Sequence, residues 1–226
     1  MTMMNTTYAK KAAKAGLSAA GLALTAALLA SCATAPTAQQ VDEATQQVLK
    51  NSFSEQGIAK MDRLTLDASN QACSEAAGKP LDEKLAKSIE EANLKTVKLP
   101  SDGKYLGSWA EGEKIAQNGR GLTWTDKPGE ANGGSCYNCH QISKAELSFG
   151  SIGPSLYNYG KLRGVSNPAS AESKPIVDYT WGKLWNAKAY NACSDMPRFG
   201  HASILDEQQI RDVMALLLDP NSPVNK

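Results

Sequence analysis

One short string, Cys136-Tyr137-Asn138-Cys139-His140, constrains this chain more than any other feature. Two thiols three residues apart lie on the same side of a helical turn, and an imidazole follows directly. Three groups able to bond to carbon or to a metal are thus concentrated within one turn. The chain has 226 residues, of which 42% are hydrophobic and 21% charged, as in a globular rather than a disordered protein. We therefore expect one or two small domains built around this string.

The spacing of the string is the signature of covalent haem attachment. The two thiols meet the two vinyl groups on one porphyrin edge, and His140 then presents its imidazole to the iron. A thioredoxin-like redox pair would need a βαβ context, which the sequence lacks. A zinc site would need four ligands, often as two separated pairs. We predict one covalently attached haem c on Cys136 and Cys139.

Two further residues are candidates for the surroundings of the iron. The rigid carbonyl of Pro154 is expected to accept a hydrogen bond from His140 Nδ1, although an ordinary Gly-Pro turn would look the same. Met196, in a turn-rich loop, is the predicted sixth ligand, because a thioether raises the reduction potential relative to a second His. His201 is the main alternative, and Met61, Met214 or a free cysteine are others. A six-coordinate iron favours electron transfer over oxygen chemistry.

The start of the chain predicts export. Lys10, Lys11 and Lys14 precede residues 16–30, an apolar or small stretch too short to span a bilayer as a helix. The stretch ends Leu29-Ala30-Ser31-Cys32, which resembles a lipoprotein lipobox. Residues 1–31 are then a lipoprotein-type signal peptide, with Cys32 lipidated in the periplasm. Ordinary cleavage nearby, after Ala33, is the alternative.

Two cysteines remain, Cys73 and Cys193. An oxidising compartment favours a disulfide between them. They could instead be free buried thiols, or Cys193 could accept sulfane sulfur. The formal net charge of +1 gives no basic field that would indicate nucleic-acid binding.

Helix signals and the break between them predict two regions. These are a tether and helical extension over 32–103 and a monohaem domain over 104–226. The tether covers 33–40, and 41–97 is expected to be helical, with Pro80 in the first turn of a helix that carries one apolar face. That face is predicted to consist of Leu81, Leu85, Ile89 and Ala92. Residues 100–103 are a break.

The second domain is expected to begin and end with helices. Ser108 with Glu111, and Asp206 with Gln209, are capping boxes. The first helix should end at Asn118, and the glycine-rich stretch after it should be loop. The last helix carries an apolar stripe at Ile210, Val213, Met214 and Leu217 and stops at Pro220. Little periodicity is found over 119–205.

Side chains near the methionine loop have expected roles too. The aromatic residues Tyr179, Trp181, Trp185 and Tyr190 should pack around the porphyrin and the core. Lys183, Lys188 and Arg198 are expected to be solvated charges rather than a docking site for an acidic partner.

The order of these features over roughly 104–220 resembles class I cytochromes c, which are all-α. Within that family the strings 152–160, 179–183, 186–191 and 196–200, followed by Leu217-Leu218-Asp219-Pro220, resemble the SoxX proteins. His140 and Met196 match the iron ligands of that family. The extension at 41–97 and the lipobox at Cys32 depart from its simplest pattern.

The resemblance implies a partner and a reaction. SoxX proteins are monohaem subunits of SoxAX, an L-cysteine S-thiosulfotransferase that joins thiosulfate to a cysteine of the carrier SoxYZ. The bond-forming haem belongs to SoxA, so this chain would hold no catalytic residue and would pass electrons to a downstream cytochrome. A stand-alone periplasmic or membrane-tethered electron carrier is the alternative, since nothing in composition or spacing indicates sulfur.

Overall fold

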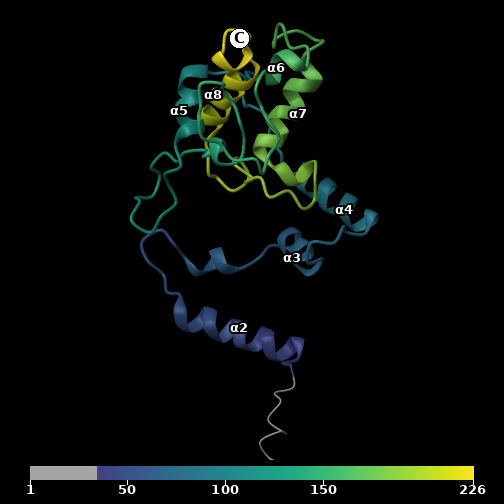
Figure 1. Ribbon diagram of the computed structural model, residues 1–226, viewed down its shortest axis with the longest axis vertical. Coiled ribbons are helices and arrows are strands. Elements are labelled where there is room, and N and C mark those ends of the chain that lie inside the picture. The colour runs from purple at the N-terminus through teal and green to yellow at the C-terminus, as the bar shows by residue number, and fades with distance from the viewer. Residues whose placement is uncertain (1–34) are drawn as a thin grey trace, which may run out of the picture. The chain divides into compact units, whose positions relative to one another are not determined.

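The computed structural model describes residues 35–226 (Figure 1). The predicted signal peptide 1–31, the lipidation candidate Cys32 and the alternative cleavage site lie outside the described residues. Contacts divide the chain into two compact units, one up to Phe53 and one from Ser54 to Lys226. In the first unit, helix α2 (Ala38–Ser52) begins with a capping box between Thr37 and Gln40. Helix α2 therefore begins within the last residues of the predicted tether and continues into the stretch that is predicted to be helical.

The second unit is built from helices joined by loops. In chain order they are η1 (Met61–Leu64), α3 (Ala68–Glu75), α4 (Glu83–Leu94), α5 (Trp109–Gln117), η2 (Cys136–Asn138), α6 (Tyr159–Leu162), α7 (Lys174–Trp185), η3 (Ala187–Ala189), α8 (Glu207–Leu218) and η4 (Pro223–Asn225). The part of the chain that the structure describes contains no strand, only an isolated bridge between Gln56 and Ala59. The predicted all-α fold is confirmed there. Across the same residues, no helix combines the length and hydropathy that a membrane span requires.

The helix ends follow local chemistry. Ser108 Oγ accepts a hydrogen bond from Glu111 N at 3.4 Å, but the Glu111 carboxylate pairs with Lys114 instead of returning to the cap. Only half of the first predicted capping box is therefore present. The second box, between Asp206 and Gln209, is complete. Helices α5 and α8 end one residue before Asn118 and Asp219, as predicted.

The extension differs from its prediction. It is interrupted rather than continuously helical over 41–97. Helix α4 begins at Glu83 after the cap Asp82, so Pro80 precedes the helix instead of lying in its first turn. Its buried side chains are Ile89 and Asn93. Leu85 is 43% exposed, so the predicted apolar face is wrong. The reason is that α4 faces its neighbours partly through hydrogen bonds.

Residues 54–103 belong to the same compact unit as the rest of the second domain. Helix α4 packs against η3, and Trp181 Nε1 donates to Lys98 O at 2.7 Å. The contacts thus divide the chain after Phe53, whereas the sequence predicts a boundary near Lys104. Single hydrogen bonds between segments so distant in sequence leave no local signal.

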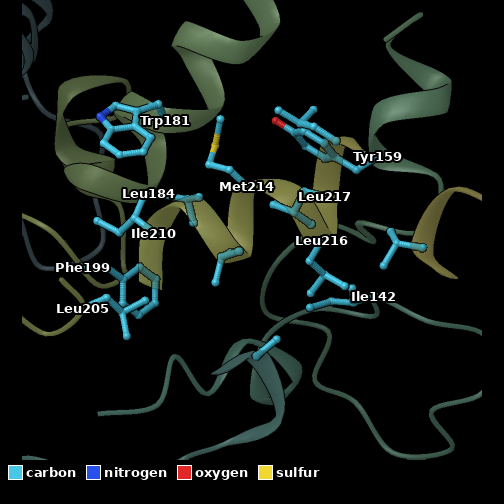
Figure 2. Packing of buried hydrophobic residues seen from close by; sticks show 14 of the residues in the cluster. Ile142, Tyr159, Trp181, Leu184, Phe199, Leu205, Ile210, Met214, Leu216 and Leu217 are labelled. Carbon is cyan, nitrogen blue, oxygen red and sulfur yellow. The ribbon is translucent and has the colours of Figure 1, made fainter. Parts of the chain in front are cut away.

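The core is centred on α8. Helices α5 and α8 lie side by side (Figure 1), and a Cβ on Gly112 would lie 2.1 Å from Asp212 O. A glycine is therefore required where the two backbones approach. Figure 2 shows the side chains of α8 against those of α7 and the loop before α8. Ile210, Met214 and Leu216 are fully buried, and each such side chain contributes about 1.5–3 kcal/mol.

Helix α7 has no counterpart in the predicted elements. It begins with a proline in its first turn and buries Val177, Thr180, Trp181, Gly182 and Leu184. Val177, Thr180, Trp181 and Leu184 recur at spacings of three and four and therefore share one face, with Gly182 outside it. The apolar residues Ile176 and Tyr179 lie off that face, which obscures the stripe in the sequence. Trp181 stacks on Trp185 with ring centroids 6.1 Å apart and meets Tyr105 edge-on at 5.5 Å.

Candidate functional site

The Cys136–His140 string forms one tight turn. Ser135 has a left-handed backbone with φ of 53°, which turns the chain into η2. Cys139 N and His140 N both donate to Cys136 O, at 3.1 and 2.9 Å. Both cysteines are free and partly buried. The local backbone therefore holds two thiols and one imidazole on a single turn.

A second segment runs alongside this turn. Gly153 N donates to Cys139 O at 2.9 Å, and Leu156 N donates to Gln141 O at 2.7 Å. A Cβ on Gly153 would lie 2.1 Å from His140 Cε1. Only glycine lets the backbone come this close to the imidazole, so the ring position is tightly limited.

The imidazole is oriented by the residue that follows. His140 Nδ1 lies 2.7 Å from Pro154 O. Because a carbonyl can only accept, Nδ1 carries the hydrogen in this contact, and in the neutral ring the lone pair is then on Nε2. This is the tautomer that a metal ligand at Nε2 needs. The structure thus places Pro154 where the sequence predicts it.

The first thiol has an apolar environment. Burial raises the pKa of Cys136 to about 12, with smaller contributions from Cys139 and Glu113. Next to it, Tyr137 donates its hydroxyl to Glu113 at 2.8 Å, and burial followed by this contact raises the pKa of Tyr137. Over residues 35–226, no three His, Cys, Asp or Glu side chains are grouped as a metal-ion site would require.

The predicted sixth ligand lies in a loop against the core. Met196 is partly buried and packs on the cluster that also contacts Cys136. Of the alternatives, Met214 is fully buried within α8, His201 is exposed, and Met61 lies in η1 of the extension. Met196 as an iron ligand stays a prediction.

The residues fit a haem c on several independent grounds. Two free thiols and an imidazole with an open Nε2 lie on one turn. Apolar side chains of the core pack against Cys136 and Met196. Trp185 Nε1 is buried and has no hydrogen-bond partner in the protein. A buried donor of this kind is costly unless a bound group accepts from it.

Cys73 and Cys193 form a disulfide with a Cα–Cα distance of 5.5 Å. This is the pairing that the sequence favours. It leaves no thiol on Cys193 to accept sulfane sulfur. The disulfide links α3 of the extension to the loop that carries Met196.

The expectation of solvated basic side chains near this loop is wrong for two residues. Lys188 is only 5% exposed, and its Nζ donates to Ala192 O at 3.0 Å. Burial, followed by the Arg198 charge, lowers the pKa of Lys188. Arg198 forms an ion pair with Asp67. Asp67 and Glu90 were not singled out from the sequence, where only Cys73 pointed to this part of the chain.

Comparison with known proteins gives two matches. Residues 109–219 match the family model described as cytochrome c. A protein of Aquifex aeolicus (strain VF5), described as an uncharacterized lipoprotein, is 34% identical over 132 residues. That alignment covers 58% of this chain and 59% of the relative, so much of the relative's length has no counterpart in the match.

Proposed function

We propose that this chain, in which residues 109–219 are a cytochrome c domain, is an exported electron-transfer protein with one haem c on Cys136 and Cys139. The observation that carries the proposal is the hydrogen bond from His140 Nδ1 to Pro154 O at 2.7 Å. In that arrangement the imidazole is fixed in position and tautomer, with Nε2 available to iron.

The chain's own residues supply attachment and orientation. Bound haem provides one-electron chemistry at its iron. Cys136 and Cys139 would hold it covalently, and the imidazole of His140 and the thioether of Met196 would bind its iron. A thioether raises the reduction potential and a complete ligand set excludes small molecules. Both properties suit an electron carrier.

The finer proposal is a role in sulfur oxidation as a SoxX-type subunit. Its support is the resemblance of the ordered strings between residues 152 and 220. In this role the chain pairs with SoxA, accepts electrons released when thiosulfate is joined to SoxYZ, and passes them to a downstream cytochrome. The catalytic haem would lie on SoxA, so the chain itself would transfer electrons only.

A stand-alone, membrane-tethered carrier is the second candidate. The relative from Aquifex aeolicus is described as a lipoprotein, and Cys32 follows a lipobox-like string in this chain. A lipid on Cys32 would hold the domain at a periplasmic membrane face. Such a carrier would exchange electrons with respiratory partners without thiosulfate.

A reconstituted reduction assay separates the two candidates. The ferric haem protein is mixed with thiosulfate, SoxA and SoxYZ, and reduction is followed by visible absorption. The SoxX-type role predicts reduction only when all three are present, and none when the carrier cysteine of SoxYZ is alkylated beforehand. Reduction that ignores the alkylation, or no reduction in the complete mixture, contradicts it. Co-purification with SoxA from the native periplasm checks the partner independently.

A further inference from the structure

We propose that the extension segment, residues 67–98, is a positioning element that holds the methionine loop, residues 190–198, and so keeps Met196 on the iron. The inference rests on the proposed function, because it takes Met196 as the sixth ligand. It gives the extension a role in setting the properties of the haem.

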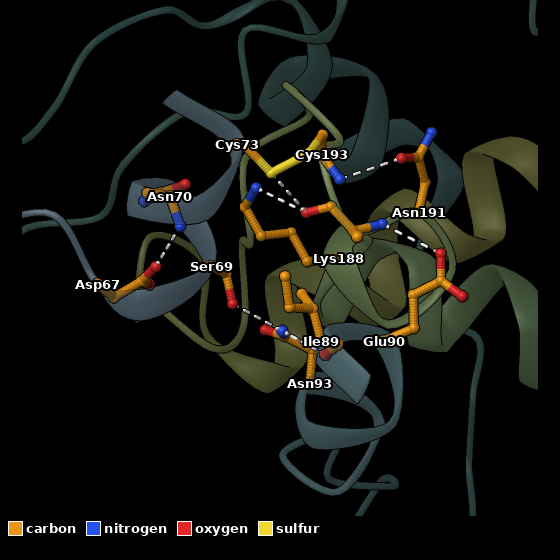
Figure 3. Close-up of a disulfide and its surroundings, with 11 residues drawn as sticks. Asp67, Ser69, Asn70, Cys73, Ile89, Glu90, Asn93, Lys188, Asn191 and Cys193 are labelled. Carbon is orange, nitrogen blue, oxygen red and sulfur yellow. Dashed lines mark hydrogen bonds between the residues drawn. A yellow bond between two sulfur atoms is a disulfide. The ribbon is translucent and has the colours of Figure 1, made fainter. Parts of the chain in front are cut away.

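Two contacts from α3 and its N-cap reach the loop on either side of Met196, and Figure 3 shows the first of them, the disulfide. The disulfide joins Cys73 to Cys193, three residues before the methionine. Asp67 pairs with Arg198, two residues after it. Asp67 is also the N-cap of α3 and accepts from Asn70 N at 2.8 Å. One short helix with its N-cap therefore fixes both ends of the six-residue stretch 193–198.

Helix α4 adds a third contact. Glu90 Oε1 accepts a hydrogen bond from Ala192 N at 3.1 Å. Asn93, which is buried, donates to Ser69 Oγ at 3.1 Å and accepts from Asn186 Nδ2 at 2.9 Å. Helices α3 and α4 are thus connected to each other and to the residues just before η3. Breaking a buried hydrogen-bonded set of this kind leaves unpaired groups, which is costly.

The loop has mostly local hydrogen bonds of its own. Met196 N donates to Ser194 Oγ at 3.3 Å, and Ser194 N donates to Asn191 O at 3.0 Å. From the rest of the domain, Lys188 donates to Ala192 O, and Tyr190 packs edge-on against Tyr179 of α7 with ring centroids 4.9 Å apart. After the methionine, the buried side chain of Phe199 joins the loop to the core. The stretch from Ala192 to Asp195 therefore depends chiefly on the extension segment.

A cavity of about 430 Å³ lies between the extension segment and the loop. Leu66, Asn70 and Ser74 line one side, and residues 193–198 line the other. Dense packing normally limits the movement of a loop. Because this interface is not densely packed, the disulfide, the ion pair and the Glu90 contact are what restrain the loop. Losing them should increase local opening without unfolding the domain.

The test compares haem-loaded variants with a matched control. The test variants are the double substitution Cys73→Ser with Cys193→Ser, and Asp67→Asn. The control is Asp102→Asn, which breaks an ion pair with Arg211 on α8. The two ion pairs have similar side-chain exposure, 41% and 17% for Asp67 and Arg198 against 43% and 13% for Asp102 and Arg211.

The measurements report on the iron ligand and on the loop separately. Cyanide binding to the ferric protein requires Met196 to leave, so its rate reports opening of the loop. The methionine-to-iron charge-transfer band and the reduction potential report ligation. Amide hydrogen exchange at Ala192 and Met196 reports the backbone. Exchange in α8 shows whether the domain as a whole has loosened.

We expect the double cysteine variant to bind cyanide at least about tenfold faster, equivalent to about 1.4 kcal/mol of lost restraint. Its charge-transfer band should weaken, and exchange should rise at residues 192–196 but not in α8. Asp67→Asn should show a smaller change of the same kind, and Asp102→Asn none. Wild-type rates and band in the double variant and in Asp67→Asn would overturn the inference.

Failure of the ligand assignment has a different signature. Met196→Ala should abolish the band in the otherwise unchanged protein. A retained band means that Met196 is not the ligand, which overturns both the assignment and the inference. A lost band with unaffected extension variants overturns the inference alone. Should the double variant not fold, the native protein with its disulfide reduced and alkylated replaces it, and Asp67→Asn is unaffected by that problem.

Discussion

The haem-attachment turn and the methionine loop are assembled in different ways. At the turn, the contact that orients His140 spans 14 residues, and the thiols lie on the same short stretch. At the loop, the ion pair of Arg198 spans 131 residues and the disulfide of Cys193 spans 120. His140 is positioned by local backbone, and the loop that carries Met196 by a distant part of the chain. The two sides of the proposed site should therefore fail in different ways.

The largest expected effect is on the local side. Replacing Cys136 and Cys139 with alanine removes the groups that bond the haem, so the variant should contain no covalently attached haem. Haem staining of a denaturing gel, with intact mass, measures this directly. The double substitution of Cys73 and Cys193 is the matched control, because it also removes two cysteines, and it should stain as strongly as the wild type. Equal staining of both variants would break the distinction between the two regions.

Among the contacts between the extension and the methionine loop, the disulfide should contribute most to the free energy of unfolding. A native disulfide that closes a loop of this length contributes about 2–5 kcal/mol, largely by restricting the unfolded chain. Denaturant unfolding of the double serine variant should show a loss in that range. A loss well below 1 kcal/mol would mean that the noncovalent contacts alone hold the extension. Unfolding the wild type with and without reductant is an independent check.

Gly153→Ala tests the packing at the haem-attachment turn without replacing a proposed ligand. Its Cβ would meet the imidazole of His140 at 2.1 Å, so the ring must shift or the segment must move. Overpacking of this kind costs about 1–3 kcal/mol, and it should also change the reduction potential. Gly164→Ala is a control with no atoms near the added carbon, although its positive φ adds some backbone strain. Equal potentials in wild type and Gly153→Ala would contradict the packing described here.

The smallest effect is the pH dependence of the Asp67 contact. Burial alone would raise the pKa of Asp67, but the Asn70 N–H and the Arg198 guanidinium outweigh it and hold this pKa below the ordinary 3.8. Because the native pKa is depressed, the stabilisation is complete well above pH 3.8 and is lost as the pH falls through the native pKa. For so exposed a pair the contribution is about 0.2–1 kcal/mol. The free energies of unfolding of the wild type and of Asp67→Asn should converge as the pH falls. A difference between them that stays constant down to low pH would contradict this.

The same contrast explains what could be predicted from the sequence. The turn, the His140–Pro154 contact and the caps of α8 are local, and in each of them the residues lie within 14 positions of one another. The pairing of Cys73 with Cys193 is also predictable, because no other cysteines remain once the other three have been assigned. The all-α fold followed from helix signals at both ends of the domain.

What the sequence did not reveal depends on long-range contacts. Lys188 is buried in η3, which packs against the distant helix α4, and Asp67 pairs with Arg198 across 131 residues. The buried face of α4 was misplaced because Asn93 is buried through hydrogen bonds rather than through an apolar side chain. Helix α7 buries mainly one face, but the apolar Ile176 and Tyr179 off that face obscure its stripe in the sequence.

The ligand pair is tested most directly by the proton NMR spectrum of the reduced, haem-loaded protein. A methionine bound to ferrous haem gives a strongly upfield-shifted methyl resonance, because its methyl group lies over the porphyrin ring. The account predicts one such resonance, absent in Met196→Ala and retained in Met61→Ala. Absence of the resonance from the native protein, or its persistence in Met196→Ala, would contradict the His140 and Met196 ligand set.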